Sequence, residues 1–324
     1  MANNDKSKGG IFTSLVFLAL LLTFAAVVLS AHLRLASIGV GCADWPGCFG
    51  YIAVERPAGL VPTSTAGAVH RLAASLLGLV VLVITLMAIR GRRPAGVGIV
   101  APLLVFALTV FLSVLGYSTP SPDLPVVTLG NLGGGMAMLA LLWWMGQRAA
   151  EPVTDAPPPG LRRWTLLALL VLIIQLGLGA WTSASFAGPA CASLPDCNGA
   201  WLSLENLRQG FDPMTRLSID DGGKVVTGAV QKTVHMTHRL GAVVTVLLIG
   251  VLAFRSMKLD ARFRSTGISV AVLLISQVVL GAGMVLTELP LLLVTLHNAV
   301  AALLLLTVVN LIHLTTPHER PARI

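Results

Sequence analysis

The sequence predicts an all-α polytopic membrane protein with eight transmembrane helices. Of its 324 residues, 55% are hydrophobic and only 11% are charged, whereas about a quarter of the residues of a soluble domain are charged. The chain therefore has too few polar side chains to cover a soluble domain. Its net charge of +8 could suggest nucleic-acid binding, but no basic run has aromatic residues interleaved with it. We therefore expect a lipid bilayer around the helices and no nucleic-acid partner.

Eight apolar segments are long enough to cross about 30 Å of hydrocarbon, and a spanning segment of this kind must be helical to satisfy its backbone in lipid. The segments are 11–31, 66–90, 97–117, 125–146, 163–183, 232–254, 267–287 and 291–313. The first could instead be a signal peptide or a lipoprotein leader cleaved before Cys42. We expect it to be retained, because its apolar stretch of about 20 residues exceeds most signal cores and Gly39 stands where a lipoprotein leader has an aliphatic residue.

The distribution of charge predicts the orientation of the helices. With the N-terminus inside, the inner segments carry 14 basic and five acidic residues, and the outer segments carry six basic and nine acidic residues. Cytoplasmic loops of membrane proteins carry an excess of basic residues. Both termini are therefore expected in the cytoplasm, with the long segments 32–65 and 184–231 on the outer side.

The two halves of the chain repeat each other. A linker, 151–162, separates a predicted N-terminal four-helix bundle, 1–150, from a C-terminal one, 163–324. Each half has a C-x3-P-x-C-x-G loop, then a His-Arg-Leu helix and then a Val-Thr-Leu-x-Asn segment. These landmarks lie at Cys42, His70 and Val127 in the first half and at Cys191, His238 and Val294 in the second. Their common order predicts a duplication that forms two pseudo-symmetric bundles.

All four cysteines belong to the repeated loop, as Cys42 and Cys48 in the first half and as Cys191 and Cys197 in the second. On the oxidising side of a membrane, such a closely spaced pair around a central proline suits a disulfide-closed turn in each loop. A transient redox pair, a metal site and disulfides between the two loops are the alternatives. The metal site is disfavoured because each loop offers two thiols and no nearby histidine.

Several histidines lie inside predicted spans, where ionisable side chains are costly and mark functional sites. His238 and His297 are each about six residues from the outer end of a span, which places both about 9 Å below the outer surface. Two level imidazoles on facing helices can ligate one haem iron axially; a hydrogen-bonded pair of core histidines is the alternative. Arg239, next to His238, would pair with a haem propionate or with lipid headgroups.

The first half carries only part of this pattern. His70 and Arg71 occupy the places of His238 and Arg239, but the counterpart of His297 is Gly130 or Asn131, depending on the register. Neither residue replaces an imidazole as an iron ligand. His70 would therefore be a single axial ligand that leaves the iron an open position, or a hydrogen-bonded polar residue in a degenerate half.

Together these landmarks resemble the haem A synthase family, the cytochrome oxidase assembly proteins of bacteria and mitochondria. The resemblance covers nearly the whole chain, and Asp-Trp-Pro-Gly-Cys48 and the later Trp143-Trp144 pair are most similar to the proteobacterial branch. It implies a multi-pass protein of the bacterial inner (cytoplasmic) membrane. The partners that it implies are a haem O synthase (a farnesyltransferase) and the cytochrome oxidase assembly machinery, and it allows a homo-oligomer.

The resemblance also assigns a role to each bundle. The C-terminal bundle would hold a b-type haem between His238 and His297. The N-terminal bundle, with His70 as its catalytic residue, would bind haem O and oxidise the C8 methyl group, through hydroxylated stages, to the formyl group of haem A. Family members typically have a glutamate three residues before the first His-Arg and a histidine in the fourth helix, where this chain has Gly67 and Asn131.

These two departures bear on catalysis, because a methyl oxidation needs a proton acceptor close to the reacting carbon. Glycine offers none, and an asparagine amide cannot serve as a general base. The leading hypothesis is a membrane oxidoreductase that converts haem O to haem A. The second hypothesis is a non-catalytic haem-binding membrane protein of the same family that transfers, senses or scaffolds haem during oxidase assembly.

Overall fold

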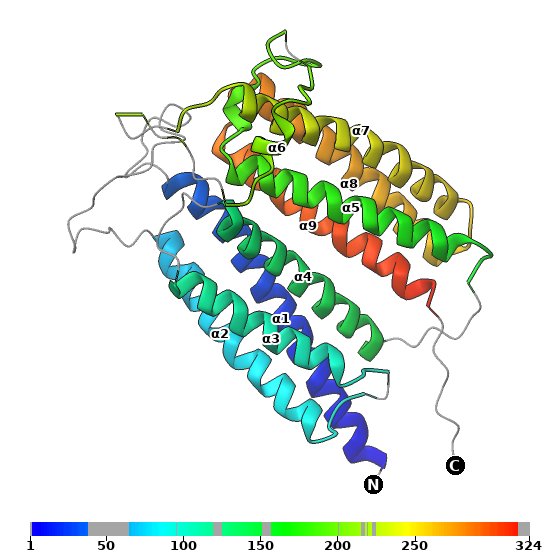
Figure 1. Cartoon of the computed structure of the whole chain (residues 1–324). Coiled ribbons are helices and arrows are strands. Elements are labelled where there is room, and N and C mark those ends of the chain that lie inside the picture. Colours follow the sequence, from blue (N-terminus) through cyan, green and yellow to red (C-terminus); the bar gives the residue numbers. More distant parts are fainter. Residues whose placement is uncertain are drawn as a thin grey trace.

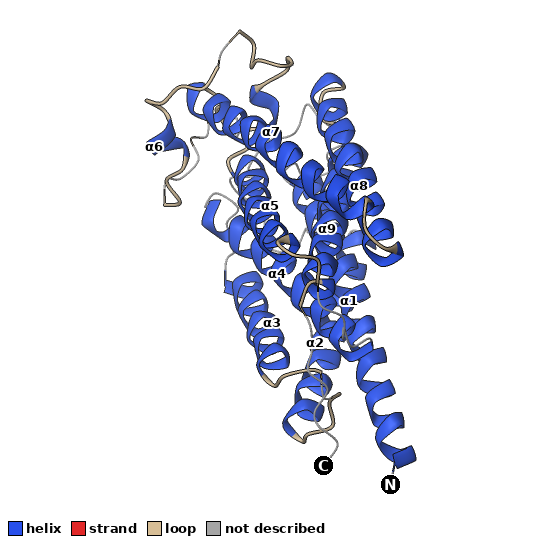
Figure 2. Cartoon of the chain, turned by 90° about the vertical axis from the view of Figure 1, so that its right-hand side faces the viewer, coloured by secondary structure: helices blue, strands red, loops and turns tan. Residues whose placement is uncertain are grey.

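Long helices make up most of the protein, as the computed structural model shows (Figure 1; Figure 2). It describes residues 2–37, 65–94, 96–118, 125–150, 157–199, 201–214, 218, 220–221 and 225–316, and this part of the chain forms no sheet. The long helices are α1 (Ala2–Ser37), α2 (Thr65–Ile89), α3 (Val100–Ser118), α4 (Pro125–Ala150), α5 (Leu161–Ala184), α7 (Ala229–Met257), α8 (Ala261–Leu286) and α9 (Leu291–Leu314). Between α5 and α7 lie a 3-10 turn, Gly188–Ala190, and the four-residue α6 (Leu207–Gly210).

The chain is a multi-pass membrane protein. Seven of the described helices are long and apolar enough to cross a bilayer, and α3, with its apolar stretch Val100–Gly116, is shorter. Large apolar side chains such as Leu79, Leu247 and Val279 are more than 60% exposed on the outside of the helices, as expected where lipid replaces water. The eight predicted segments coincide with the eight long helices to within a few residues, except that α1 begins at Ala2 instead of residue 11.

Contacts between the helices form two closed rings. In the first ring α1 contacts α2, α2 contacts α3, α3 contacts α4 and α4 returns to α1; α5, α7, α8 and α9 are connected in the same way. The rings meet where α4 contacts α5 and α9 and where α1 contacts α9 (Figure 1). At this seam Gln147 of α4 donates a hydrogen bond to Asn310 of α9, and Leu306 of α9 belongs to the same buried core as α1 and α4.

Local sequence specifies where several helices begin. The side chain of Asp260 accepts hydrogen bonds from the backbone N–H groups of Arg262 and Phe263 and so caps the first turn of α8. Gly160 precedes α5 with a φ of 75°, a left-handed conformation that a residue with a Cβ adopts at a cost. Both starts are therefore specified by the residue that directly precedes the helix.

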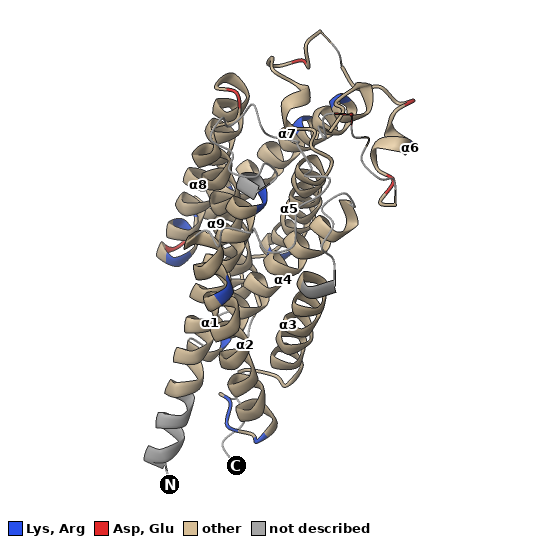
Figure 3. Ribbon diagram, turned by 90° about the vertical axis from the view of Figure 1, so that its left-hand side faces the viewer, with Lys and Arg blue, Asp and Glu red and all other residues tan. Residues whose placement is uncertain are grey.

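The loops gather at two ends of the molecule. The segment between α5 and α7, with α6, lies at the end opposite to the start of α1 and the end of α9 (Figure 1). Asp and Glu residues are drawn in this segment, and the turn between α2 and α3 is drawn with Lys or Arg residues (Figure 3). Both signs of charge occur at the turn between α7 and α8, where Asp260 lies between Lys258 and Arg262.

Candidate functional site

The ring formed by α5, α7, α8 and α9 brings together one polar side chain from each helix. Nε2 of Gln175 on α5 lies 3.0 Å from Nδ1 of His238 on α7 and donates to the His238 backbone carbonyl at 3.1 Å. On the other side, Nε2 of Gln277 on α8 lies 2.9 Å from Nε2 of His297 on α9. His238 also lies within electrostatic range of His297. We call these four residues the His–Gln site.

A glycine lies beside each imidazole, one helical turn after the glutamine. A Cβ added to Gly179 would lie 3.1 Å from Cε1 of His238, and one added to Gly281 would lie 3.3 Å from Cε1 of His297. Residues four apart share one face of a helix. On α5 and on α8, one face therefore presents the glutamine amide to the imidazole and, at the glycine, leaves room for that imidazole. The site therefore contains two similar cradles, one for each imidazole.

The two histidines lie on helix faces that lead into the core of this ring. His238 shares its face of α7 with Thr245 and Leu252, and His297 shares its face of α9 with Leu304, at helical spacings of seven residues; these companions are buried. The expectation of equal depth used a start at residue 232, and α7 in fact begins at Ala229. His238 is consequently further from the start of its helix than His297 is from the start of α9.

This donor set fits a haem iron better than a bare metal ion. The described part of the chain contains no group of three His, Cys, Asp or Glu residues that could hold a metal, whereas a porphyrin leaves only two axial positions to the protein. One ring nitrogen of each histidine is within reach of a glutamine amide, and the other is left for a further partner. Nδ1 of His297, for example, is buried and has no hydrogen-bond partner among the described residues.

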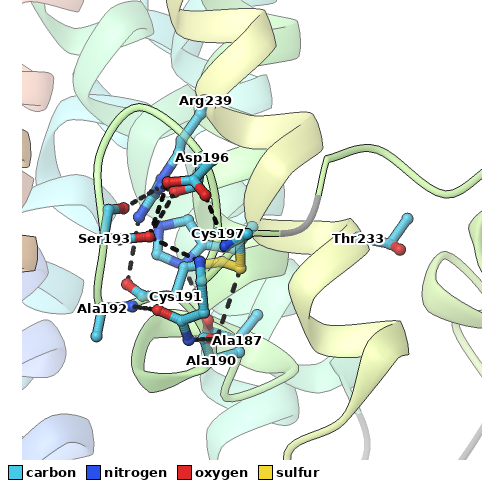
Figure 4. The surroundings of a disulfide bond; sticks show 12 residues. Ala187, Ala190, Cys191, Ala192, Ser193, Asp196, Cys197, Thr233 and Arg239 are labelled. Carbon is cyan, nitrogen blue, oxygen red and sulfur yellow. Dashed lines mark hydrogen bonds between the residues drawn. A yellow bond between two sulfur atoms is a disulfide. The ribbon is translucent and has the colours of Figure 1, made fainter.

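Arg239, which follows His238, holds the 191–199 loop against α7 (Figure 4). Its Nη1 donates to the carbonyls of Ser193 at 2.7 Å and Asp196 at 2.6 Å, and its Nη2 donates to the carbonyl of Cys191 at 3.2 Å. The sequence predicts a haem propionate or lipid headgroups as its partner, and this stays a prediction. In the structure three backbone carbonyls accept from the Nη groups, and the buried Nε has no partner among the described residues.

A disulfide closes this loop. Cys191 and Cys197 are both buried and bonded to each other, which confirms one of the two predicted pairs; Cys42 and Cys48 lie outside the described residues. His235 adds a second anchor for the same segment, since it is buried and its Nδ1 lies 3.0 Å from the carbonyl of Ala187. Arg239 and His235 thus attach the loop to the helix that carries His238.

Asp196 makes this loop sensitive to acid. Its carboxylate accepts hydrogen bonds from Oγ of Ser193 at 2.9 Å and from the N–H of Gly199 at 2.6 Å. These bonds, that of Ser193 first, hold the pKa of Asp196 below its ordinary value of 3.8. The stabilisation is therefore complete above the ordinary pKa and is lost as the pH falls through the lowered one.

We expect protease cleavage of the 191–199 loop to accelerate when the pH falls from 6 to below 3.8, because the Asp196 carboxylate takes up its proton only as the pH passes through its lowered pKa. An acid-active protease with limited digestion and mass spectrometry measures this. The Asp196→Asn protein should be cleaved readily at both pH values, and an equal acid response in that variant would contradict the role of the carboxylate.

In the N-terminal ring, neither α3 nor α4 carries a histidine that could face His70. His70 is half-buried on α2, and the neighbouring Arg71 is exposed. At Gly130 of α4 an added Cβ would lie 2.8 Å from Cδ2 of Leu115 and 3.6 Å from Cζ of Phe111. Side chains of α3 thus occupy the space beside Gly130. In the C-terminal ring the corresponding residue, His297, faces α8, which is the counterpart of α3. The repeat register that pairs Gly130 with His297 fits this geometry.

The glutamines also have no counterpart in the first half. Counted from the repeated cysteines, Gln175 corresponds to Ala26 of α1. The Val-Leu-Gly sequence shared by α3 and α8 pairs Gln277 with Leu112. Asn131 and Gly67, where the family typically has histidine and glutamate, are both half-buried. The His–Gln site is therefore a property of the C-terminal half alone among the described residues.

Sequence reasoning identified the histidines of the site but missed Gln175 and Gln277. A signal for them exists, because both are polar residues within apolar spans. Both also begin the same sequence, Gln-x2-Leu-Gly-Ala, at residues 175–180 and 277–282. Without the positions of the neighbouring helices, however, this pattern does not show which side chain the amide faces.

Comparison with known proteins places the chain among related sequences. A protein of Shewanella oneidensis named "Heme A synthase" is 32% identical over 318 residues, which cover 92% of this chain and 95% of the relative. Proteins of the same name from Erythrobacter litoralis and Halalkalibacterium halodurans are 30% identical over 249 residues (74% of this chain, 69% of the relative) and 23% identical over 279 residues (83% and 85%).

The COX15-CtaA family model, described as cytochrome oxidase assembly protein, matches residues 63–309. This range includes α2, all of α4, and the whole His–Gln site. The family resemblance seen in the sequence is thereby confirmed, and it implies that the protein binds haem. Since the match covers far more than half of the chain, the protein belongs to the COX15-CtaA family of cytochrome oxidase assembly proteins.

Proposed function

We propose that the protein is a haem A synthase, a membrane oxidoreductase that converts the C8 methyl group of haem O to the formyl group of haem A for cytochrome c oxidase assembly. The observation that carries this proposal is similarity over 92% of the chain to a protein named for that activity. The presence of two imidazoles with an amide partner each in the C-terminal ring supports the haem-binding part of the proposal independently.

In this proposal His238 and His297 hold a b-type haem in the C-terminal ring. The haem held by these two residues would supply one-electron transfer. Helices α5 and α8 keep the imidazole rings of these two histidines in place through Gln175 and Gln277.

Haem O is the substrate of the N-terminal ring, where His70 would bind its iron as the single axial ligand. Oxidation of a methyl group to a formyl group, with water as the source of the oxygen atom, releases about four electrons and four protons, so it requires an electron acceptor and a base. Neither Gly67 nor Asn131 is a base. A proton acceptor must then come from another group, and Asp44 and Glu55 are acidic residues of the loop that precedes α2.

A second candidate function is haem binding or transfer without catalysis. It is favoured by the packing at Gly130, because Leu115 and Phe111 fill the space beside the residue that corresponds to His297 in the repeat. Under this proposal, the C-terminal site alone holds haem, and the protein delivers or senses it during oxidase assembly.

The wider arrangement follows from the same proposal. The two rings are pseudo-symmetric four-helix bundles, residues 1–150 and 163–324, joined by the linker 151–162, and α3 is the eighth membrane span. Both termini lie in the cytoplasm and the protein resides in the bacterial inner membrane, in keeping with the excess of basic residues in the inner segments. A haem O synthase would supply its substrate, and the assembly machinery of the oxidase would receive its product.

Co-expression with a haem O synthase tests the enzymatic proposal. Haems extracted from the membranes are separated by chromatography, and we expect haem A in cells with the wild-type protein and only haem O in cells with His70→Ala. Val69→Ala, which alters an exposed side chain next to His70, should leave haem A unchanged. Haem O alone beside protein-bound haem B in the wild type would reject catalysis and support the binding role.

A further inference from the structure

The glutamines of the His–Gln site each contain a buried atom without a partner. Oε1 of Gln175 and Oε1 of Gln277 are both buried and accept no hydrogen bond from the described residues. An unsatisfied buried acceptor costs free energy, and here the same defect occurs twice, on two different helices. In each case the amide nitrogen of the same side chain faces a ring nitrogen of a histidine, at 3.0 Å for Gln175 and 2.9 Å for Gln277.

When a neutral imidazole binds a metal, the glutamine beside it must supply a hydrogen-bond acceptor. When one ring nitrogen binds iron, the other carries the proton and needs an acceptor, and metal-ligating histidines almost always have one. A half-turn of the glutamine amide exchanges its NH2 group and its oxygen. This exchange would place the orphaned Oε1 against the ring N–H and satisfy both atoms in one step.

From these contacts we propose that Gln175 and Gln277 are positioning residues for the haem ligands, and that each accepts a hydrogen bond from the iron-distal N–H of its imidazole when haem is bound. This proposal rests on the haem site of the proposed function. Gly179 and Gly281 contribute to the same positioning, because a Cβ at either residue would lie in close contact with the imidazole that the amide orients.

The two cradles differ in two respects. Gln175 faces Nδ1 of His238, which leaves Nε2 for iron, whereas Gln277 faces Nε2 of His297, which leaves Nδ1. The NH2 group of Gln175 also donates to the backbone carbonyl of His238, and a Cβ on Gly241 would collide with its Oε1. Gln277 has no second bond of this kind among the described contacts. Turning the amide of Gln175 therefore gives up a hydrogen bond that Gln277 does not lose, so Gln277 is the better residue to test.

The test uses the purified full-length protein in detergent with haem B bound, and it compares Gln277→Met with Gln277→Glu. Methionine has a similar length but accepts no N–H bond of comparable strength, so it should make the imidazole a weaker donor to iron. Loss of such a partner typically lowers metal affinity about 10- to 100-fold, and we expect haem transfer to apomyoglobin to accelerate in this range. The midpoint potential of the haem should become more positive.

Glutamate keeps an acceptor and strengthens it, so Gln277→Glu should shift the midpoint potential in the negative direction and retain haem. A residue that only fills space would not produce opposite shifts. Gln147→Met serves as the matched control, because Gln147 is a glutamine of α4 bonded to Asn310 outside the site; its haem potential should equal that of the wild type.

The outcomes separate this inference from the proposed function. If wild-type protein shows no low-spin bis-histidine haem spectrum, the haem site itself is wrong and the inference is wrong with it. If the wild type shows this spectrum but Gln277→Met and Gln277→Glu keep its potential and haem retention, the site stands and the positioning role is overturned. If Gln277→Met aggregates, the test rests on Gln277→Glu, whose folding is checked by monodisperse elution in size-exclusion chromatography.

Discussion

Replacement of His297 by alanine is expected to abolish the low-spin haem spectrum of the purified protein. Among the described residues of the C-terminal ring, only His238 and His297 have a glutamine partner, and they lie within electrostatic range of each other. Iron in a bis-histidine site needs both imidazoles. Loss of a supporting residue already costs about 10- to 100-fold in metal affinity, so loss of a ligand should exceed this. Reduced-minus-oxidised absorption spectra and haem content per protein measure the effect, and His238→Ala should behave in the same way.

His32→Ala is the matched control for this experiment. His32 belongs to α1 and its Nδ1 lies 3.5 Å from Oγ1 of Thr295 on α9, close to the C-terminal ring but outside the His–Gln site. Its removal should leave the spectrum intact. A His297→Ala protein that retained the full bis-histidine spectrum would remove the central assignment of the site, whatever the result for haem A formation.

The helices of this protein were predictable because the bilayer imposes a length on them. An apolar run such as 291–313 must cross about 30 Å of hydrocarbon, and the observed α9, Leu291–Leu314, follows that requirement almost residue by residue. The four-residue α6 was not predicted, since it lies in an extramembrane loop where no such constraint applies. His238 and His297 were found for a related reason: an ionisable group inside an apolar span is conspicuous in sequence.

The partners of these histidines were not predictable in the same way. A glutamine in an apolar span is neutral and less conspicuous, and Gly179 gains a role only when α7 places His238 against it. Arg239 illustrates a different limit. Its carbonyl partners converge because the disulfide and the left-handed residues Asn198 and Gly199 turn the loop, and no spacing in the sequence specifies this turn.

Replacement of Gly267 by alanine is expected to destabilise the protein more than an added methyl group at any other glycine discussed above. A Cβ on this buried residue of α8 would lie 2.9 Å from the backbone carbonyl of Ala253, the backbone N of Met257 and the Cβ of Ser256, all on α7. Backbone atoms cannot rotate away, so α7 and α8 would have to separate. Small residues at helix crossings in membranes permit such close approach, and overpacking typically costs about 1–3 kcal/mol.

Thermal unfolding in detergent, followed by the fraction that stays monodisperse, measures the cost of Gly267→Ala. Gly250→Ala is the matched control: Gly250 lies on α7, and a Cβ there meets nothing within 4 Å in the described structure, so its unfolding temperature should not fall. The contact lies near the turn that joins α7 and α8, whereas His238 and Gln277 lie towards the other end of these helices. Gly267→Ala should therefore lower the unfolding temperature while the folded fraction keeps its haem spectrum, and unchanged unfolding would contradict the close crossing of α7 and α8.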